Sequence, residues 1–321
     1  MEPDRRGPQD GGDQRRDVTL SQTAPEVIRA VPVRHWGRWI SALAVLLVGG
    51  WLTCAAAQAH FIDVSVVRRY LTSPLILKGL QATVALAVLA QGTGIAIGIL
   101  VAVMRLSKNP VMTGLASFYV WFFRGTPVLV QLFFWFNGVP SVFKTLTIAV
   151  PFTHITLYST PMVEFMTPFM AAFLGFSLNE GAYMAEIVRG GILSVDEGQI
   201  DAAQALGMTS TLTLRRIVLP QALRVIVPPT GNEFIAMLKT TSLAAAITYG
   251  ELLRRASDIY STNLAVVPLL VVASLWYLVL TSTASVGQYY VERRLARGRG
   301  RSLPDTPWQR VVRNITRRPR W

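Results

Sequence analysis

Long apolar runs, separated by short polar segments, dominate this chain. A helix needs about 20 apolar residues to cross the roughly 30 Å hydrocarbon core of a bilayer. On that measure we predict six spans, near residues 37–58, 77–104, 113–138, 166–189, 225–247 and 264–289. The runs are too long and too evenly apolar for barrel strands, which alternate over about ten residues. The predicted fold class is an all-α transmembrane helical bundle.

The distribution of charge supports a membrane protein and predicts its orientation. Only 15% of the 321 residues are charged, against about 25% in a soluble domain. The net charge is +13, and 23 of the 31 Lys and Arg fall on one side if both termini are cytoplasmic. This bias favours cytoplasmic termini and contact with anionic lipids. Nucleic-acid binding is not expected, because no basic patch is interleaved with aromatic residues in a soluble module.

The sequence lacks the residues that a metal site, an intramembrane active site or an ATP site would require. Cys54 is the single cysteine, and the three histidines are far apart, so we predict no metal site. No Asp lies within a predicted span and no His lies at the core of one, which argues against an intramembrane enzyme. The chain has no Gly-Lys dipeptide and therefore no phosphate-binding loop for ATP. We predict no catalytic residue and no cofactor bound by this chain.

The third and fifth predicted spans are interrupted by proline, and the second span contains a pair of glycines that allows close helix packing. Arg124 and Pro127 interrupt the third span, so that 110–123 is either part of it or an interfacial helix before a crossing that starts near Thr126. Pro228 and Pro229 are predicted to break the fifth span. In the second span, Gly94 and Gly98 form a Gly-xxx-Gly pair that lets helix backbones approach closely.

Polar residues at membrane depth are expensive and are candidates for a substrate pathway. The candidates are Asn179, Glu180, Glu186, Asn232, Glu233 and Lys239. A break at Pro228–Pro229 would free backbone N–H groups near 230–232, which could hold a carboxylate. The alternative is that these side chains pair with one another across helices or lie near interfaces. In that case Glu186 would pair with Arg189 or Arg216.

The predicted cytoplasmic loop at 194–220 has the pattern of a helix, a glycine turn and a second helix. Ser194 and Glu197 form a capping-box pattern, and Gly207 supplies a left-handed stop after an Ala-rich helix. Thr209 and Ser210 can cap the next helix, which Pro220 is predicted to close. On these features alone, an ordinary helical hairpin remains an equal alternative to a docking surface.

The same loop resembles the EAA loop of ABC-importer permeases. The positions that match are Asp201, Ala202, Ala203, Gly207, Ile217, Leu219 and Pro220, with Asp201 in place of the usual Glu. Residues 123–131, 181–189 and 219–234 are similar to the polar amino-acid branch of that family, and the resemblance covers roughly 75–295. It implies a multi-pass cell-membrane permease of an ATP-driven amino-acid importer.

The resemblance also implies partners and a domain organisation. Such permeases work as dimers, with a second copy or a sister permease, two ATPase subunits that carry ATP-Mg, and an external substrate-binding protein. The domains expected are a disordered tail at 1–35, an extra span with external linker at 36–75, the permease domain at 76–295 and a basic tail at 296–321. A stand-alone secondary transporter or channel, and a sugar or peptide permease, remain alternatives. The amino acid carried is not readable.

Overall fold

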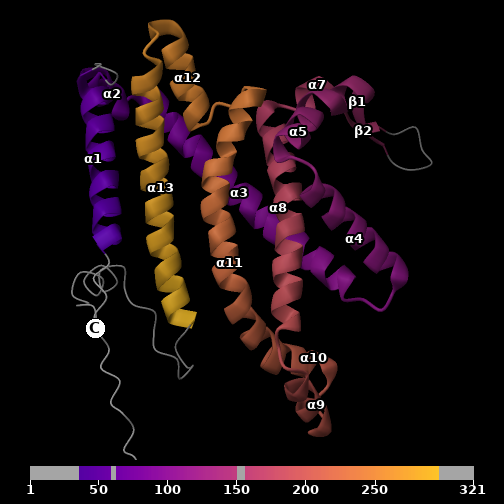
Figure 1. Cartoon of the computed structure of the whole chain (residues 1–321). Coiled ribbons are helices and arrows are strands. Elements are labelled where there is room, and N and C mark those ends of the chain that lie inside the picture. Colours follow the sequence, from indigo (N-terminus) through magenta and orange to yellow (C-terminus); the bar gives the residue numbers. More distant parts are fainter. Residues whose placement is uncertain (1–35, 59–62, 150–155, 296–321) are drawn as a thin grey trace, which may run out of the picture. The chain divides into compact units, whose positions relative to one another are not determined.

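The computed structural model describes residues 36–58, 63–149 and 156–295, so the tails 1–35 and 296–321 lie outside it. The described chain is mostly helical (Figure 1). Its elements are α1 (Trp36–Gln58), α2 (Val64–Leu71), α3 (Pro74–Arg105), α4 (Pro110–Gly125), α5 (Val128–Phe133), the π-helical η1 (Phe134–Gly138), α6 (Val139–Val142), β1 (Thr145–Ala149), β2 (Thr156–Pro161), α7 (Met162–Phe165), α8 (Pro168–Leu193), α9 (Glu197–Ala205), α10 (Ser210–Thr213), the π-helical η2 (Leu214–Val218), α11 (Leu219–Thr240), the 3-10 helix η3 (Thr241–Ile247), α12 (Leu252–Asn263) and α13 (Val266–Leu295).

Three of the helices begin at the same local signal, a capping side chain followed by proline. Ser73 precedes α3, Asn109 precedes α4 and Thr167 precedes α8, and each side chain accepts a hydrogen bond from a backbone N–H of the first turn. Proline at the first position fixes φ near its helical value and lacks an N–H that would have no partner there. The starts of these helices are therefore encoded locally.

The close packing of α3 against α8 organises the bundle, with the two helices crossing in Figure 1. A Cβ added at Gly94 would lie 2.6 Å from Cγ of Glu180. One added at Gly98 would collide with Met184 and lie 2.9 Å from the backbone nitrogen of Ala185. The two glycines thus let α3 lie directly on α8, and the predicted close-packing pair is confirmed.

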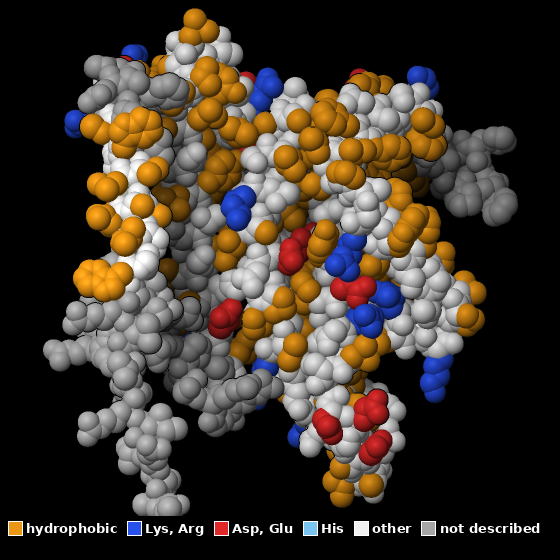
Figure 2. All heavy atoms as spheres, in the orientation of Figure 1, with side chains coloured by type: hydrophobic (Ala, Val, Ile, Leu, Met, Phe, Trp, Pro, Cys, Tyr) orange, Lys and Arg blue, Asp and Glu red, His pale blue; other side chains and the backbone are white. Residues whose placement is uncertain are grey.

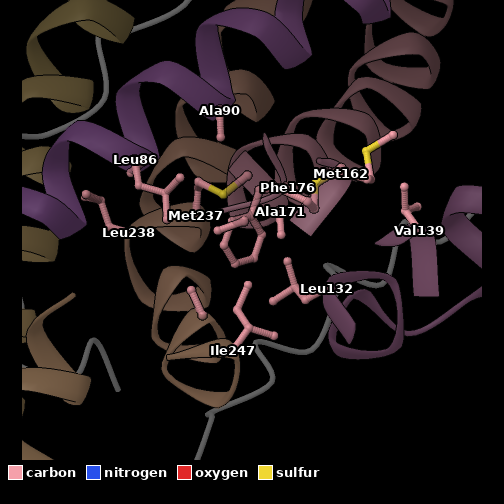
Figure 3. Packing of buried hydrophobic residues seen from close by; sticks show 14 residues of the cluster. Leu86, Ala90, Leu132, Val139, Met162, Ala171, Phe176, Met237, Leu238 and Ile247 are labelled. Atoms are coloured by element: carbon pink, nitrogen blue, oxygen red, sulfur yellow. The ribbon is translucent and has the colours of Figure 1, made fainter. Parts of the chain in front are cut away.

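An apolar cluster fills the space beside this crossing (Figure 3). Phe176 of α8 is 1% exposed and lies among Leu86 of α3, Leu132 of α5, Met237 of α11 and Ile247 of η3. Because the cluster draws on five elements far apart in sequence, it fixes the upper halves of these helices against one another.

Large apolar side chains also cover much of the outside. Exposed examples are Leu100 of α3, Trp121 of α4 and Leu278 of α13, each more than half exposed. Within the described residues, α3 and α13 are long and apolar enough to cross a membrane. The short helices α9 and α10 lie at one end of the unit 49–305, and α2 and α12 lie at the other (Figure 1). Asp63 caps α2, and hydrogen bonds from Ser65 and Val66 lower the pKa of its carboxyl.

The interruption predicted at Arg124 and Pro127 is observed: α4 ends at Gly125, and the chain resumes as α5, η1 and α6 after the extended residues Thr126 and Pro127. One expectation from the sequence needs correction. The all-α assignment missed a small antiparallel sheet, in which β1 pairs with β2 from Thr145 opposite Pro161 to Ala149 opposite Thr156. Neither strand has the length or the even apolar pattern that the search for spans detects.

We expect Gly98→Ala to lower the free energy of unfolding by about 1–3 kcal/mol, because the added methyl forces α3 away from α8. The measurement is thermal unfolding of the purified protein. Gly92→Ala is the matched control in the same helix, where an added Cβ meets nothing within 4 Å, and it should leave the melting temperature unchanged or slightly raised. Equal effects of the two variants would contradict the packing described here.

Candidate functional site

A polar cavity of about 470 Å³ lies where the break after α4 meets α8 and α11. Its charged and strongly polar lining consists of Arg124, Asn179, Glu180, Tyr183 and Glu233. Figure 2 shows acidic and basic side chains side by side near the middle of the visible face, with other charged side chains toward its upper and lower ends. The structure thus brings together three of the six predicted pathway residues, namely Asn179, Glu180 and Glu233, with Arg124.

Glu180 is held in place from α3. It is 4% exposed, and Nε2 of Gln91 donates a 2.9 Å hydrogen bond to its Oε1. Gly94, one turn further along α3, leaves room for the Glu180 side chain to lie flat against that helix. A buried carboxylate needs such a donor, because an unsatisfied charged group at this depth is expensive. Gln91 is therefore a positioning residue for Glu180.

The break between α4 and α5 is stabilised by amide side chains. Nε2 of Gln131 donates to the carbonyl of Phe123 at 3.1 Å and to Oγ1 of Thr126 at 2.8 Å. Nδ2 of Asn179 donates to the same Phe123 carbonyl at 2.8 Å. These bonds satisfy a carbonyl that the interrupted helix leaves open, and they fix the backbone that carries Arg124. Asn179 therefore serves the break as well as the cavity.

Arg124 sits at the C-terminal end of α4, where the helix dipole favours a cation. Its guanidinium carbon lies 5.0 Å from the centre of the Tyr183 ring, and its Nη1 lies 3.8 Å from Oε1 of Glu186. The side chain is 44% exposed. The sequence assigned Arg124 a structural role at the break, whereas the structure also turns it into the cavity.

Glu186 belongs to an ion-pair network beside the cavity and does not line it. Its carboxylate pairs with Arg105 of α3, with Arg189 of α8 at 3.0 Å and, at longer range, with Arg124. The predicted alternative partner Arg189 is confirmed, while Arg216 has no ion pair with Glu186. One carboxylate thus joins the ends of three helices.

Glu233 differs from the other acidic residues of the cavity. It is half-buried on α11, and within the described residues no hydrogen bond or ion pair is formed by its carboxylate. Arg124 lies across the cavity and interacts with it electrostatically. The cavity therefore holds one carboxylate that is free to take a cationic partner.

The remaining pathway candidates lie elsewhere, and the predicted break in α11 is wrong. Asn232 and Lys239 are exposed and do not line the cavity, and Oδ1 of Asn232 accepts a hydrogen bond from Gln288. Helix α11 continues through Pro228 and Pro229. The two prolines remove the helical donors to the carbonyls of Arg224 and Val225. Side chains bond two neighbouring carbonyls, since Gln288 Nε2 donates to that of Pro228 at 3.1 Å and Thr230 Oγ1 donates to that of Ile226 at 2.8 Å. No free N–H cluster opens at 230–232.

The loop between α8 and α11 exposes a small, mostly uncharged tip. Gly207 has φ +76°, the left-handed value predicted for it, and its N–H bonds the carbonyl of Gln204. Asp201, Ala202 and Leu206 are exposed, Leu206 to 82%, whereas Ala203 is buried under the tip. Among the later positions that match the EAA loop, Leu219 and Pro220 are exposed and Ile217 is half-buried.

Two details of this loop differ from the prediction. Helix α9 begins at Glu197 after Asp196, and the Ser194 hydroxyl donates to the carbonyl of Gly191, so the capping box does not form. Pro220 does not close a helix. It lies at the start of α11, and η2 is the wider turn through which α10 continues into α11 without the proline N–H.

Sequence reasoning overlooked the residues that position the site. Gln91 and Gln131 were not selected, although both are polar and only 5% exposed within long apolar runs. Glu251 was assigned to an external loop, yet it is fully buried and accepts hydrogen bonds from the N–H groups of Leu253 and Arg254 and from the Tyr277 hydroxyl. For Gln91 and Gln131, the available signal was an amide side chain within a predicted span.

Comparison with known proteins agrees with this architecture. Residues 94–297 match the family described as binding-protein-dependent transport system inner membrane component. The arginine transport system permease protein ArgU of Corynebacterium glutamicum is 45% identical over 284 residues, which cover 88% of each chain. The glutamine transport system permease protein GlnP of Escherichia coli is 32% identical over 222 residues, or 69% of this chain and 93% of that protein.

A solved structure shows the same likeness. The crystal structure of an amino acid ABC transporter with histidines is 34% identical, with a TM-score of 0.60 over 73% of this chain and 99% of that one. This chain belongs to the family of inner membrane components of binding-protein-dependent transport systems, and it is a membrane protein. The predicted resemblance to importer permeases of the amino-acid branch is confirmed.

We expect Glu186→Gln to lower the free energy of unfolding by about 1–3 kcal/mol, because three arginines lose their shared carboxylate in a partly buried site. Thermal unfolding in detergent is the measurement. The control is Asp258→Asn, which also removes a carboxylate that pairs with two arginines but lies on α12, at the end opposite to α9 and α10. A larger loss for Asp258→Asn would contradict the importance given to the Glu186 network.

Proposed function

We propose that this chain is the permease subunit of an ATP-driven importer of amino acids with a cationic side chain, and that the polar cavity binds the amino acid during passage. The observation that carries the proposal is the unpaired Glu233 carboxylate opposite Arg124. Every amino acid presents a carboxylate and an ammonium group. Arg124 suits the first by a bidentate contact, and the acidic side chains suit the second.

The balance of charge in the cavity favours a cationic substrate. Two carboxylates, those of Glu180 and Glu233, face one guanidinium among the lining residues. A zwitterion leaves one of these carboxylates unmatched, whereas a substrate with a cationic side chain supplies a second positive group. The arginine transport permease is the most similar of the compared relatives and supports this choice, while the glutamine relative supports a neutral substrate as the second candidate.

The proposed topology has six spans with both termini in the cytoplasm, formed by α1, α3, the segment from α4 to α6, α8, α11 and α13. The domains are those predicted, with 36–75 added ahead of a permease domain at 76–295. The α9–α10 loop then lies on the cytoplasmic side, and α2 and α12 face the external substrate-binding protein. A second permease copy or a sister permease completes the pathway, and anionic lipids contact the basic tail.

The α9–α10 loop is proposed to dock into a partner ATPase, of which the complex carries two with their ATP-Mg. Small side chains at 202 and 205 and the glycine at 207 let the partner approach the backbone closely, and Leu206 supplies an apolar contact. Asp201, Leu219 and Pro220 lie at the edges of this surface, whereas Ala203 supports it from inside. A stand-alone channel or gradient-driven carrier is the competing function and needs no ATPase.

We expect Glu233→Gln to reduce uptake of arginine by roughly ten- to a hundred-fold, the loss of one charge-assisted contact of about 1.5–3 kcal/mol. The measurement is uptake of labelled arginine, beside glutamine, into proteoliposomes that hold the complete transporter. Glu164→Gln is the control, because Glu164 is exposed on α7 and does not line the cavity. Unchanged arginine uptake in Glu233→Gln would show that the polar cavity is not the binding site.

We expect Gly207→Arg to abolish ATP-dependent uptake while the protein still inserts into the membrane, since its bulk blocks close docking at the tip. Gly207→Asn is the matched variant, because Asn tolerates the left-handed backbone and should keep most of the activity. Co-purification of the ATPase subunits is measured beside uptake. Full uptake in Gly207→Arg, or ATP-independent conduction by the wild type, would favour the channel.

A further inference from the structure

A second, apolar cavity of about 840 Å³ lies between α3, α8 and α11, in addition to the polar one. Side chains such as Ile99, Val188 and Leu223 line it, and it contains no charged residue. We call it the apolar groove. The two linings share no residue, but Met184 of the groove follows Glu180 of the polar cavity by four residues on α8, and Thr230 precedes Glu233 by three residues on α11. The groove therefore adjoins the polar cavity on the side of the α9–α10 loop.

The groove has the length of one bilayer leaflet. On α11 its lining runs from Leu219 to Thr230, and on α3 from Ile95 to Ser107. At 1.5 Å per residue both stretches extend for about 16–18 Å, close to half of the roughly 30 Å hydrocarbon core. An acyl chain that enters at the loop end can thus lie along the groove to the middle of the membrane.

The loop end of the groove is flanked by cations. Lys108 follows the lining residue Ser107, and Arg215 follows the lining residue Leu214. Both are exposed, and neither forms an ion pair within the described ranges. Basic side chains at the edge of an intramembrane pocket bind anionic lipid headgroups. A neutral lipid would gain nothing from these two positions.

We propose that the apolar groove holds an acyl chain of an anionic phospholipid from the leaflet on the loop side, with the headgroup between Lys108 and Arg215. The proposal uses the cytoplasmic placement of the loop under the proposed function. The wholly uncharged lining and the two cations at the loop end favour a lipid over a second permease copy as the occupant.

The lipid site adjoins the α9–α10 loop. Ile192 and Leu214 line the groove and also line a smaller cavity of about 280 Å³ inside the loop, beside Glu197. A chain seated in the groove supports these two side chains from the membrane side. The bound phospholipid thus becomes part of the base on which the docking surface rests.

The test measures lipid retained by the complete transporter. The complex is reconstituted into nanodiscs with equal parts of phosphatidylglycerol and phosphatidylcholine, purified again and analysed by native mass spectrometry. We expect the wild type to retain phosphatidylglycerol in roughly ten-fold preference, as two cations near the headgroup predict. Ile99→Trp, which fills the groove, should lose the retained lipid. The double variant Lys108→Gln/Arg215→Gln should lose the preference for phosphatidylglycerol.

Matched controls separate the groove from the general membrane surface. Leu278→Trp adds the same bulk at an exposed position of α13, and Arg293→Gln/Arg294→Gln removes two cations at its end, so both should retain lipid like the wild type. Equal retention of the two lipids by the wild type would overturn the proposal. So would a disulfide between two copies through Ile99→Cys with Cys54→Ser, since a second copy would then occupy the groove. Bound lipid is read independently of uptake, so failure here leaves the proposed transport function standing.

Discussion

Hydrogen-bonding groups at membrane depth must find partners inside the protein, and this constraint explains most of the polar contacts described here. At several such positions a side chain from another helix supplies a hydrogen bond. Gln91 donates to Glu180, Asn179 to the carbonyl of Phe123, which the break after α4 leaves open, and Gln288 to the carbonyl of Pro228. Each of these bonds joins two helices. The polar groups therefore hold the bundle together at positions that apolar packing alone would leave unspecified.

The same constraint makes the exceptions informative. Among the acidic residues of the polar cavity, Glu180 has a close donor, whereas Glu233 has no close partner in the described structure. Arg124 forms a long ion pair with Glu186, with 3.8 Å between Nη1 and Oε1, and its guanidinium lies over the Tyr183 ring. Its side chain is nevertheless 44% exposed. Glu233 and Arg124 are the charged groups of the cavity that remain available to a transient ligand.

The sequence predicted the helices well because their signals are local. Apolar length placed α3, α8, α11 and α13 within a few residues, and the left-handed turn at Gly207 followed from the glycine itself. The break after α4 was likewise expected from Arg124 and Pro127. The continuity of α11 through Pro228 and Pro229 was not expected, because each proline removes a helical donor and normally kinks or breaks a helix. The packing of α11 against α8 and α13 is not contained in that local signal.

The sequence predicted only part of the polar cavity, because side-chain direction and burial depend on contacts between helices. Polarity at membrane depth selected Asn179, Glu180 and Glu233 correctly, but the same criterion also selected Asn232 and Lys239, which are exposed away from the cavity. Both lie within six residues of Glu233 on α11, so only the direction of each side chain separates them, and that direction is set by packing against α8 and α13. Gln91 and Gln131 were not selected, although both are polar and buried within predicted spans.

The two ends of α11 connect the proposed docking loop with the proposed substrate site. From Pro220 to Glu233 is thirteen residues, or about 20 Å of helix. Helix α8 makes the parallel connection, from Glu180 to Ile192 beside the loop. A tilt imposed on the loop is carried by both helices, but α11 has two prolines between its ends, which remove two of its backbone hydrogen bonds. Helix α11 can therefore bend where α8 stays straight. A difference in tilt between the two helices would move Glu233 relative to Glu180 and change the spacing of the carboxylates that the substrate meets.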